Sequence, residues 1–522
     1  MVLRSSSRTT REVNRAISSL RSSPGSKTRE GSSASSRARI RRSELFEKLS
    51  EPQREGVSAA VSQDGFALFF AQRTGKTWVT CGVIDQLEPE EVMIVGPKTN
   101  LESTWLATLN NLLPHYSVFL SLDDYLVFRS EWKKAWGDTP CYSILLLNYE
   151  ALPGIIKRAK KRRWNLIVYD EAQRLKQRTS RNSRLAGQLV KCSDRRIALS
   201  GTPLDKSPVD LWAIFRFVVP HVLGATWKAF EEEYIEDQTA GIREKLKRAK
   251  GQVIRQKLLL QMRIIKNKPK FKEHKWDQFI EAIKPYTMSL TKEDAGIEPA
   301  KITHVPVLML GRQRRAYDQL EGTMVVDVGK LTITTALKIV RNGKLQQITG
   351  GFIKDEEGRV RVIGDAKARK LHVLLKRLKP PVAIFARYTH EVELIVEACN
   401  DYSNRVGVIW GKVKDTKTKK RRTEVIQAFQ SGKLDYVVCQ QRTGGVGVDL
   451  FRARKGIVYS MSHSWIDFDQ MMSRLDYLKQ TERAEFFLLY CMESVDEDII
   501  VALDEKRSVS EITLERLKRR RS

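Results

Sequence analysis

The sequence predicts an α/β protein with two tandem parallel-sheet lobes, because two sets of short apolar runs alternate with longer amphipathic stretches. Short apolar runs are typical of strands buried on both faces, and the stretches between them have the period of covering helices. The strands of the first lobe are expected at residues 66–70, 92–95, 144–147, 166–169 and 197–199. Those of the second lobe are expected at residues 382–386, 406–409, 436–439, 457–460 and 486–490.

Length and charge narrow the class of protein. The chain has 522 residues, which is enough for two or three domains with complete cores. It contains 92 Lys and Arg residues against 62 Asp and Glu residues, and the difference gives a net charge of +30. A surplus of this size indicates a polyanionic partner, most simply nucleic acid, and the alternative is a basic surface that is only solvated. No apolar run approaches the ~18–20 residues of a membrane span. The six cysteines include no C-x-x-C pair, which argues against a metal site or a disulfide framework.

The composition divides the chain into five segments. Residues 1–44 are rich in Ser and Arg and are expected to be a disordered basic tail, which either holds a phosphate backbone loosely or serves as a transit peptide. The first lobe is expected at residues 45–221 and the second at residues 301–504. Residues 222–300 are charged and helical in period, so we expect a helical insertion whose basic face is either solvated or a nucleic-acid track. Residues 505–522 end in a basic run and are expected to form a C-terminal tail.

A phosphate-binding loop is predicted where the first strand ends. Residues 66–70 run into Arg73-Thr74-Gly75-Lys76-Thr77 and then into a helical stretch. A loop at such a junction directs backbone N–H groups and the positive end of a helix dipole at phosphate oxygens. Lys76 is expected to reach the β- and γ-phosphates of a nucleoside triphosphate, and Thr77 is expected to hold Mg²⁺. Phe70 occupies the position at which the full motif has its first glycine.

Two acidic residues follow another strand of the first lobe. Asp170 and Glu171 come directly after residues 166–169, and ligands bind at the carboxyl edge of a parallel sheet. Asp170 would then hold Mg²⁺ through water, and Glu171 would orient the water that attacks the γ-phosphate. The alternative is an acidic helix start that complements the helix dipole.

These residues and several further motifs resemble, in order and spacing, the motor core of helicase superfamily 2, and most closely its SNF2 branch. The further segments in the first lobe are Glu51-Pro52-Gln53-Arg54-Glu55-Gly56-Val57, Gly96-Pro97 through Trp105, Leu147-Asn148-Tyr149-Glu150 and Ser200-Gly201-Thr202-Pro203-Leu204. The resemblance implies two RecA-like lobes, and it is closest to the compact SNF2-type proteins of bacteriophages and bacteria. It also implies that Gln53 reads adenine and that Pro97 and Lys98 contact one nucleic-acid strand.

The second lobe carries the same resemblance in the segments Phe385-Ala386-Arg387-Tyr388-Thr389, Gln441 through Leu450, Ser464-Trp465 and Gln470 through Gln480. The glycine-rich segment implies phosphate contacts through the backbone of Thr443, Gly444 and Gly445. Trp465 is either the family's brace or an ordinary core residue.

The last of these segments bears on catalysis. The resemblance places Gln470 in the nucleotide site and gives Arg474 a catalytic role beside Lys76, Asp170 and Glu171. Tyr477 stands where the family has a second arginine, which reaches the γ-phosphate as a finger. An uncharged side chain at that position makes the rate of hydrolysis an open question.

The resemblance implies an ATP- and Mg²⁺-dependent translocase that binds ATP between its lobes and tracks duplex DNA with little sequence specificity. A nucleotide-gated DNA clamp with weak hydrolysis is the second hypothesis, and Tyr477 motivates it. An RNA-directed motor is a third. A cytoplasmic or nucleoid-associated protein is expected, and nuclear or organellar targeting stays possible.

Overall fold

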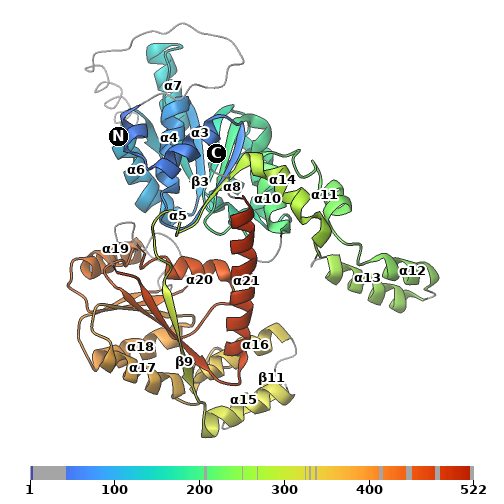
Figure 1. Cartoon of the computed structure of the whole chain (residues 1–522), viewed down its shortest axis with the longest axis vertical. Coiled ribbons are helices and arrows are strands. Elements are labelled where there is room, and N and C mark those ends of the chain that lie inside the picture. The colour runs from blue at the N-terminus through green and yellow to red at the C-terminus, as the bar shows by residue number, and fades with distance from the viewer. Residues whose placement is uncertain are drawn as a thin grey trace. The chain divides into compact units, whose positions relative to one another are not determined.

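The computed structural model describes residues 2–3, 43–204, 208–249, 251–266, 269–323, 325–328, 331–334, 338–410, 416–441, 449–476 and 482–517. The chain divides into two compact units. The first contains residues 1–71, 75–290 and 510–522, and the second contains residues 72–74 and 291–509. Figure 1 shows the elements of both units.

The first unit is built on an eight-stranded sheet with the order β1-β4-β5-β3-β6-β7-β2-β8, in which all neighbouring strands are parallel. Its strands are β1 (Val2–Leu3), β2 (Gly65–Phe70), β3 (Glu91–Gly96), β4 (Ser117–Phe119), β5 (Ser143–Asn148), β6 (Trp164–Tyr169), β7 (Ser193–Leu199) and β8 (Thr287–Leu290). The central strands are buried along almost their whole length, which is why they are continuous apolar runs in the sequence.

Helices cover this sheet and connect its strands. The α-helices are α2 (Glu44–Lys48), α3 (Glu51–Val61), α4 (Lys76–Leu87), α5 (Lys98–Asn100), α6 (Leu106–Leu112), α7 (Leu122–Trp136), α8 (Leu152–Ala159), α9 (Arg181–Leu189), α10 (Val209–Val218), α11 (Trp227–Tyr234), α12 (Ala240–Arg248), α13 (Gln252–Lys266) and α14 (Trp276–Ile283). The short turns are the π-helix η1 (Leu101–Trp105) and the 3₁₀ helices η2 (Tyr149–Ala151), η3 (Ala172–Leu175), η4 (Val190–Cys192), η5 (Glu273–Lys275) and η6 (Lys284–Tyr286).

The second unit is built on a six-stranded parallel sheet with the order β15-β16-β14-β17-β18-β9. Its strands are β9 (Lys301–Val307), β14 (Val382–Ala386), β15 (Val406–Ile409), β16 (Tyr436–Gln440), β17 (Lys455–Val458) and β18 (Glu485–Cys491), and two small antiparallel pairs are formed by β10 (Val325–Val328), β11 (Leu331–Thr334), β12 (Phe352–Lys354) and β13 (Val360–Val362). Its helices are α15 (Gly311–Thr323), α16 (Lys338–Thr349), α17 (Ala366–Arg377), α18 (Thr389–Asn400), α19 (Thr416–Gln430), α20 (Trp465–Met472) and α21 (Val495–Leu517).

The predicted fold class is confirmed, because each of the ten predicted strands overlaps a strand of one of the two parallel sheets. The strands that the sequence reading missed are the short or edge strands, such as β4 and β8, which lack a long apolar run. Within the described residues, no helix is long and apolar enough to cross a membrane.

Two segment boundaries differ from the expectation. Much of residues 222–300 belongs to the first unit, because Phe230, Phe271 and Phe279 are buried in its core and β8 pairs with β2. Only α12 and α13 stand clear of that core (Figure 1). Residues 505–517 continue helix α21 and are not a tail.

The end of α21 is held by the first unit. Leu514 and Leu517 are buried in that unit's core, and the hydroxyl of Ser289 donates to the carbonyl of Leu514 at 2.8 Å. The N-terminal segment 4–42 and residues 518–522 lie outside the described residues.

Candidate functional site

Four neighbouring strands of the first sheet bring the predicted first-lobe motifs together at one edge. Strands β3, β6, β7 and β2 are adjacent and parallel, so their carboxyl ends meet. Pro97 follows β3, Asp170 follows β6, Ser200 follows β7, and the loop at residues 71–75 follows β2. This edge is where a parallel sheet binds ligands.

The loop after β2 leads directly into helix α4, as the sequence predicts. Gly75 precedes the helix with a φ of +93°, and Arg73 also has a left-handed φ of +70°. Lys76 and Thr77 form the first turn of α4, so the backbone N–H groups of that turn point toward the loop. The Lys76 ammonium donates to the carbonyl of Phe70 at 2.8 Å and to that of Ala71 at 3.1 Å. These carbonyls hold the Lys76 charge within the loop.

Gln53 lies against this loop from helix α3. A Cβ atom added to Gly75 would lie 2.2 Å from the side-chain nitrogen of Gln53, so only glycine allows this approach. The side-chain oxygen of Gln53 accepts from the backbone N–H of Ser50 at 3.1 Å, which fixes the amide at the start of α3. Phe70 ends β2 with its ring against Gly56 of α3, so this aromatic residue packs the loop onto α3.

Asp170 is buried and its carboxylate accepts three hydrogen bonds. Oδ2 accepts from the Trp105 indole at 3.0 Å and from the Asn100 amide at 3.2 Å, and Oδ1 accepts from the backbone N–H of Glu171 at 3.0 Å. Burial and the neighbouring Glu171 raise the pKa of Asp170 above its usual range, and the donors oppose that rise. A carboxylate held by several donors keeps one orientation, which suits a metal ligand.

Trp105 contacts Asp170, a contact that the sequence did not predict. It ends the π-helix η1, and the wider turn of a π-helix displaces the side chains that follow by part of a turn. This turn directs the indole N–H of Trp105 at Asp170 from the segment that begins at Pro97. An apolar ring in the otherwise polar stretch Glu102-Ser103-Thr104 is the only signal that the sequence offers.

A chain of hydrogen bonds leads away from Glu171. The amide nitrogen of Gln173 donates to Glu171, and the Ser200 hydroxyl donates to the amide oxygen of Gln173 at 2.7 Å. The backbone N–H of Thr202 donates to the Ser200 hydroxyl at 3.2 Å. Glu171 is also held with a φ of +51°, a strained value for a residue with a side chain. The end of β6 and the end of β7 are therefore connected through buried polar groups.

The donor set at this edge fits Mg²⁺. Thr77 supplies a hydroxyl from the first turn of α4, and Asp170 supplies a carboxylate whose Oδ1 accepts one hydrogen bond and keeps a lone pair for a metal ion. Hard oxygen ligands with few protein contacts are typical of Mg²⁺ held beside a nucleotide phosphate. Within the described residues there is no group of three or more His, Cys, Asp or Glu side chains that could hold a metal ion by themselves.

The strand-tip residues Pro97 and Lys98 are placed differently. Pro97 is buried and precedes α5, whereas Lys98 is exposed and its ammonium lies 3.9 Å from the carboxylate of Glu102. Gly96, just before them, lies against Asp170: an added Cβ would be 3.1 Å from the Cβ of Asp170. Lys98 is thus accessible to a ligand that also approaches the carboxyl edge of β3.

In the second unit, Arg474 is buried beside the end of β16. Its guanidinium lies over the ring of Phe385 at 5.7 Å, and Nη2 donates to the carbonyl of Gln441 at 3.5 Å. Burial lowers the pKa of Arg474 to about 10. Nη1 is buried and has no hydrogen-bond acceptor among the described residues. A buried cation with an open donor is suited to an incoming anion.

The remaining second-lobe residues divide into three groups. Gln470 is half-buried on α20, and Trp465 at the start of that helix is buried in the core, which favours the core-packing interpretation. Lys292, which the sequence reading did not single out, is buried and bonds to Asp476 at 2.7 Å and to the Ser473 hydroxyl at 3.0 Å. It fixes the segment that contains Arg474. The predicted contacts Thr443, Gly444 and Gly445, and also Tyr477, lie outside the described residues.

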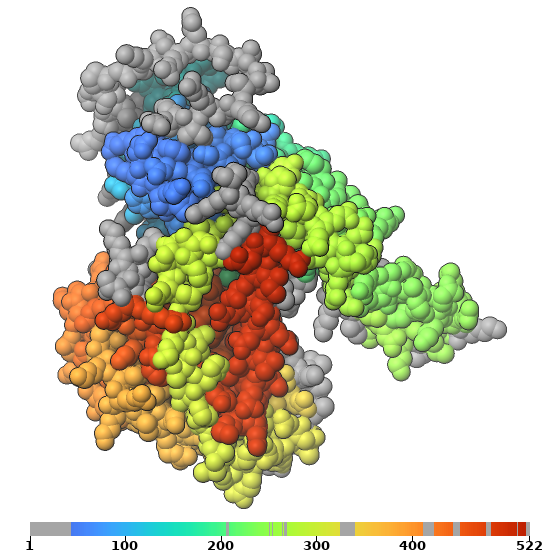
Figure 2. Space-filling view, viewed as in Figure 1, coloured from blue at the N-terminus to red at the C-terminus, as the bar shows by residue number. Residues whose placement is uncertain are grey.

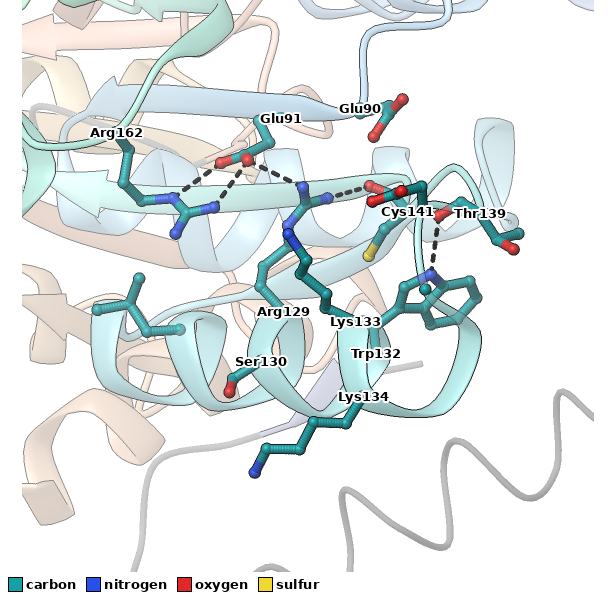
Figure 3. Close-up of a pocket in the computed structure, with 13 residues that line it drawn as sticks. Glu90, Glu91, Arg129, Ser130, Trp132, Lys133, Lys134, Thr139, Cys141 and Arg162 are labelled. Atoms are coloured by element: carbon teal, nitrogen blue, oxygen red, sulfur yellow. Dashed lines mark hydrogen bonds and ion pairs between the residues drawn. The ribbon is translucent and has the colours of Figure 1, made fainter.

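A cavity of the first unit lies at the opposite edge of the sheet, around the start of β3 (Figure 3). Glu91 accepts hydrogen bonds there from Arg129, Arg162 and Tyr125 at 2.7–2.9 Å. Glu91, Arg129 and Arg162 therefore neutralise one another, and we assign these three residues a structural role.

Comparison with known proteins identifies the family. The model of the SNF2-related domain matches residues 12–352, which is well over half of the chain. This chain belongs to the SNF2-related family. The model of the helicase conserved C-terminal domain matches residues 366–476 of this SNF2-related protein.

Three relatives illustrate the similarity of this SNF2-related chain to curated proteins. An uncharacterized ATP-dependent helicase of Mycoplasma genitalium is 21% identical over 89% of this chain and 42% of that protein. The ISWI chromatin-remodeling complex ATPase of Saccharomyces cerevisiae is 21% identical over 84% and 38%, and a putative ATP-dependent helicase/translocase of Bacillus subtilis is 22% identical over 80% and 42%. The chain thus spans about four-tenths of the length of these relatives.

Among solved structures, the SWI2/SNF2 ATPase core of Sulfolobus solfataricus in complex with double-stranded DNA is 22% identical to this chain. The match covers 90% of this chain and 96% of that one, with a TM-score of 0.36.

Proposed function

We propose that this chain is an ATP-dependent motor that hydrolyses ATP at the edge of the first sheet and moves along duplex DNA. The observation that carries the proposal is the convergence of Lys76, Asp170 and Glu171 at one carboxyl edge, with Gln53 beside the loop. This convergence supports the role in phosphoryl transfer that we propose for each side chain.

The roles follow from this geometry. The first turn of α4 and Lys76 would bind the phosphates, and Mg²⁺ held by Thr77 and Asp170 would neutralise charge that develops on them. Glu171 would orient a water whose oxygen bonds to the γ-phosphorus while the bond to the ADP oxygen breaks. The chain from Glu171 through Gln173 to Ser200 keeps that carboxylate in place. Arg474 of the second unit would donate Nη1 to the γ-phosphate when the two units close on ATP.

Duplex DNA is proposed as the track because of the net charge of +30 and because of the relatives. One of these is named a helicase/translocase, and another, from Gallus gallus, is named a chromodomain-helicase-DNA-binding protein. Basic groups that contact phosphates bind without reading sequence, so little sequence specificity is expected. Lys98 and the backbone of Thr443, Gly444 and Gly445 are the proposed contacts.

The first test is the steady-state ATPase rate of the full chain with and without duplex DNA. We expect DNA to stimulate hydrolysis, and Lys76→Ala to lower the stimulated rate by at least about 10²-fold, as removal of one charge-stabilising donor does. A rate that Lys76→Ala leaves unchanged would contradict the site. Duplex RNA and single strands, compared at one salt concentration, separate the DNA motor from an RNA-directed one.

The second candidate is a nucleotide-gated DNA clamp with little turnover, and Tyr477 favours it. An arginine finger can contribute about 10³–10⁵ in rate, and tyrosine carries no charge to replace it. If this position faces the γ-phosphate, Tyr477→Arg raises turnover several-fold or more. An unchanged or lower rate would show that the position has been assigned wrongly, and tight ATP-dependent DNA binding without turnover would favour the clamp.

A further inference from the structure

Helices α12 and α13 form an arm that stands clear of the first unit's sheet (Figures 1 and 2). The two helices pack on each other through half-buried apolar residues at helical spacing: Ile242, Leu246, Leu258, Met262 and Ile265. The other described side chains of the arm face solvent, apart from Ala249, which is half-buried. The arm is thus a two-helix hairpin with a narrow apolar seam and a large exposed surface.

The base of the arm is closed by backbone pairing. Ile235 and Phe271 form an antiparallel bridge, the N–H of Glu236 donates to the carbonyl of Lys270 at 2.9 Å, and the N–H of Lys272 donates to that of Tyr234 at 2.8 Å. Below this bridge, the rings of Tyr234 and Phe271 stack at 6.0 Å. The chain therefore leaves and re-enters the core at one point, and the core does not need the arm for its packing.

The charged side chains of the arm are almost all basic. Residues 240–249 and 251–266 contain eight Lys and Arg residues and a single acid, Glu244. That acid pairs with Lys247 at 3.0 Å, and Arg243 pairs with Asp237 at the base. Five further cations are exposed and have no acidic partner among the described residues: Lys245, Arg248, Arg255, Lys257 and Arg263.

Several other exposed cations of the first unit are ion-paired, whereas Lys157, Lys160 and Lys161, like the five of the arm, have no acidic partner among the described residues. Lys48, Lys134, Arg163, Lys228 and Lys284 each lie within 4 Å of a carboxylate. Like charges crowded on a small hairpin repel one another and lower its stability, so an arm of this composition gains when a polyanion neutralises it. Each phosphate so neutralised releases counterions, and this release favours binding.

We propose that the arm formed by α12 and α13 is a second binding surface for the phosphate backbone of duplex DNA, separate from the strand-tip contact at Lys98. The proposal rests on the proposed function, since it gives the DNA motor an additional contact with the duplex. Five exposed arginine and lysine side chains spread over both helices can neutralise phosphates, and contacts of this kind carry no base-reading geometry. The exposed apolar side chains of Ile254, Leu259 and Leu260 are the feature that a partner protein would use instead.

The test is the salt dependence of duplex binding by the full chain, measured by fluorescence anisotropy without nucleotide. The five-fold variant changes Lys245, Arg248, Arg255, Lys257 and Arg263 to Gln. If all five contact phosphates, the slope of log K against log salt falls by as much as ~4.5, since each contact contributes about 0.9. We also expect affinity at ~0.1 M salt to fall at least tenfold.

A matched control changes Lys48, Lys134, Arg163, Lys228 and Lys284 to Gln, which removes the same charge from the same unit. Equal slopes for the two variants would overturn the proposal and show a general charge effect. An excision variant that joins Glu236 to Lys270 through Asn-Gly, a favoured hairpin turn, repeats the test without the arm. Its basal ATPase rate, measured without DNA, should stay within two-fold of the parent.

The outcomes separate this proposal from the proposed function. If Lys76→Ala loses DNA-stimulated hydrolysis and the five-fold variant keeps the salt slope of the parent, the proposed DNA binding by the arm is wrong. The proposed motor function is then supported. If the five-fold variant has a lower salt slope but the parent chain does not hydrolyse ATP, DNA binding by the arm is supported and the motor function is wrong. Unchanged duplex binding in the excision variant overturns the proposal and leaves the apolar residues of α13 as a protein-binding surface.

Discussion

Asp170 of the first unit and Arg474 of the second are both buried charges, but the protein satisfies them to different degrees. Asp170 accepts hydrogen bonds from Trp105, Asn100 and the backbone of Glu171. Arg474 has a buried Nη1 with no acceptor among the described residues. Leaving a buried donor unpaired costs free energy, and a charged donor costs more than a neutral one.

This difference indicates a division of labour. The first unit holds its acidic groups ready by itself, because three donors fix Asp170 and a chain of polar groups fixes Glu171. The second unit keeps a buried cation whose Nη1 has no acceptor among the residues that the structure describes. The first arrangement suits the binding of metal and nucleotide, and the second suits a step that depends on an added anion.

The largest expected effect is that of Glu171→Gln. The substitution keeps the length of the side chain but removes the charge that we propose orients water, and loss of a general base costs about 10²–10⁴ in rate. We expect the DNA-stimulated ATPase rate to fall in that range while the affinity for a fluorescent ATP analogue stays within a few-fold. Glu281→Gln, at an exposed acid of α14 in the same unit and outside the motifs, is the control and should retain its activity. A comparable loss in both variants would contradict the role of Glu171.

The second largest effect tests the difference between Asp170, whose oxygens accept hydrogen bonds, and Arg474, whose Nη1 has no acceptor among the described residues. Arg474→Gln removes the guanidinium with the open donor, and we expect the ATPase rate to fall about 10²-fold with nucleotide affinity little changed. Because Arg474 also packs on Phe385, the melting temperature must be measured in parallel. Arg474→Lys restores the charge and should recover part of the rate if the donor acts on an anion. If the rate falls only in proportion to lost folded protein, Arg474 has a packing role.

The smallest effect tests the donors on Asp170. Trp105→Phe removes one hydrogen bond to a charged group, which is worth about 1.5–3 kcal/mol, and two other donors remain. We expect the Mg²⁺ concentration for half-maximal ATPase to rise by about three- to tenfold, with a smaller change in the maximal rate.

The control for this substitution is Trp212→Phe in the same unit. Trp212 is also buried, but its indole nitrogen has no hydrogen-bond partner within the described residues. Both variants lose a similar part of a buried ring, so packing effects should be alike. An equal Mg²⁺ requirement in the two variants would show that the bond from Trp105 does not position Asp170.

Local sequence determined the two sheets and most of the first-lobe site. Buried parallel strands must be apolar throughout, so residues 66–70 and 166–169 could be recognised directly. Lys76 and Asp170 come shortly after these strands in the sequence. The edge strand β8 escaped recognition because Thr287 and Ser289 interrupt its apolar pattern, and only pairing with β2 makes it a strand. The last residues of α21 likewise became helical by packing on the first unit's core.

The tertiary structure decided which side chains satisfy the site. Trp105 reaches Asp170 through a π-helix, and Lys292 reaches Asp476 across 184 residues of sequence, so neither contact has a local signature. Nor does composition show which of the 92 basic residues have acidic partners. Hydrogen bonds and ion pairs depend on distance in space, whereas strand and helix patterns depend on position along the chain. The sequence by itself therefore determined the sheets and the types of residue that we propose for catalysis, and folding determined which charges are satisfied among the described residues.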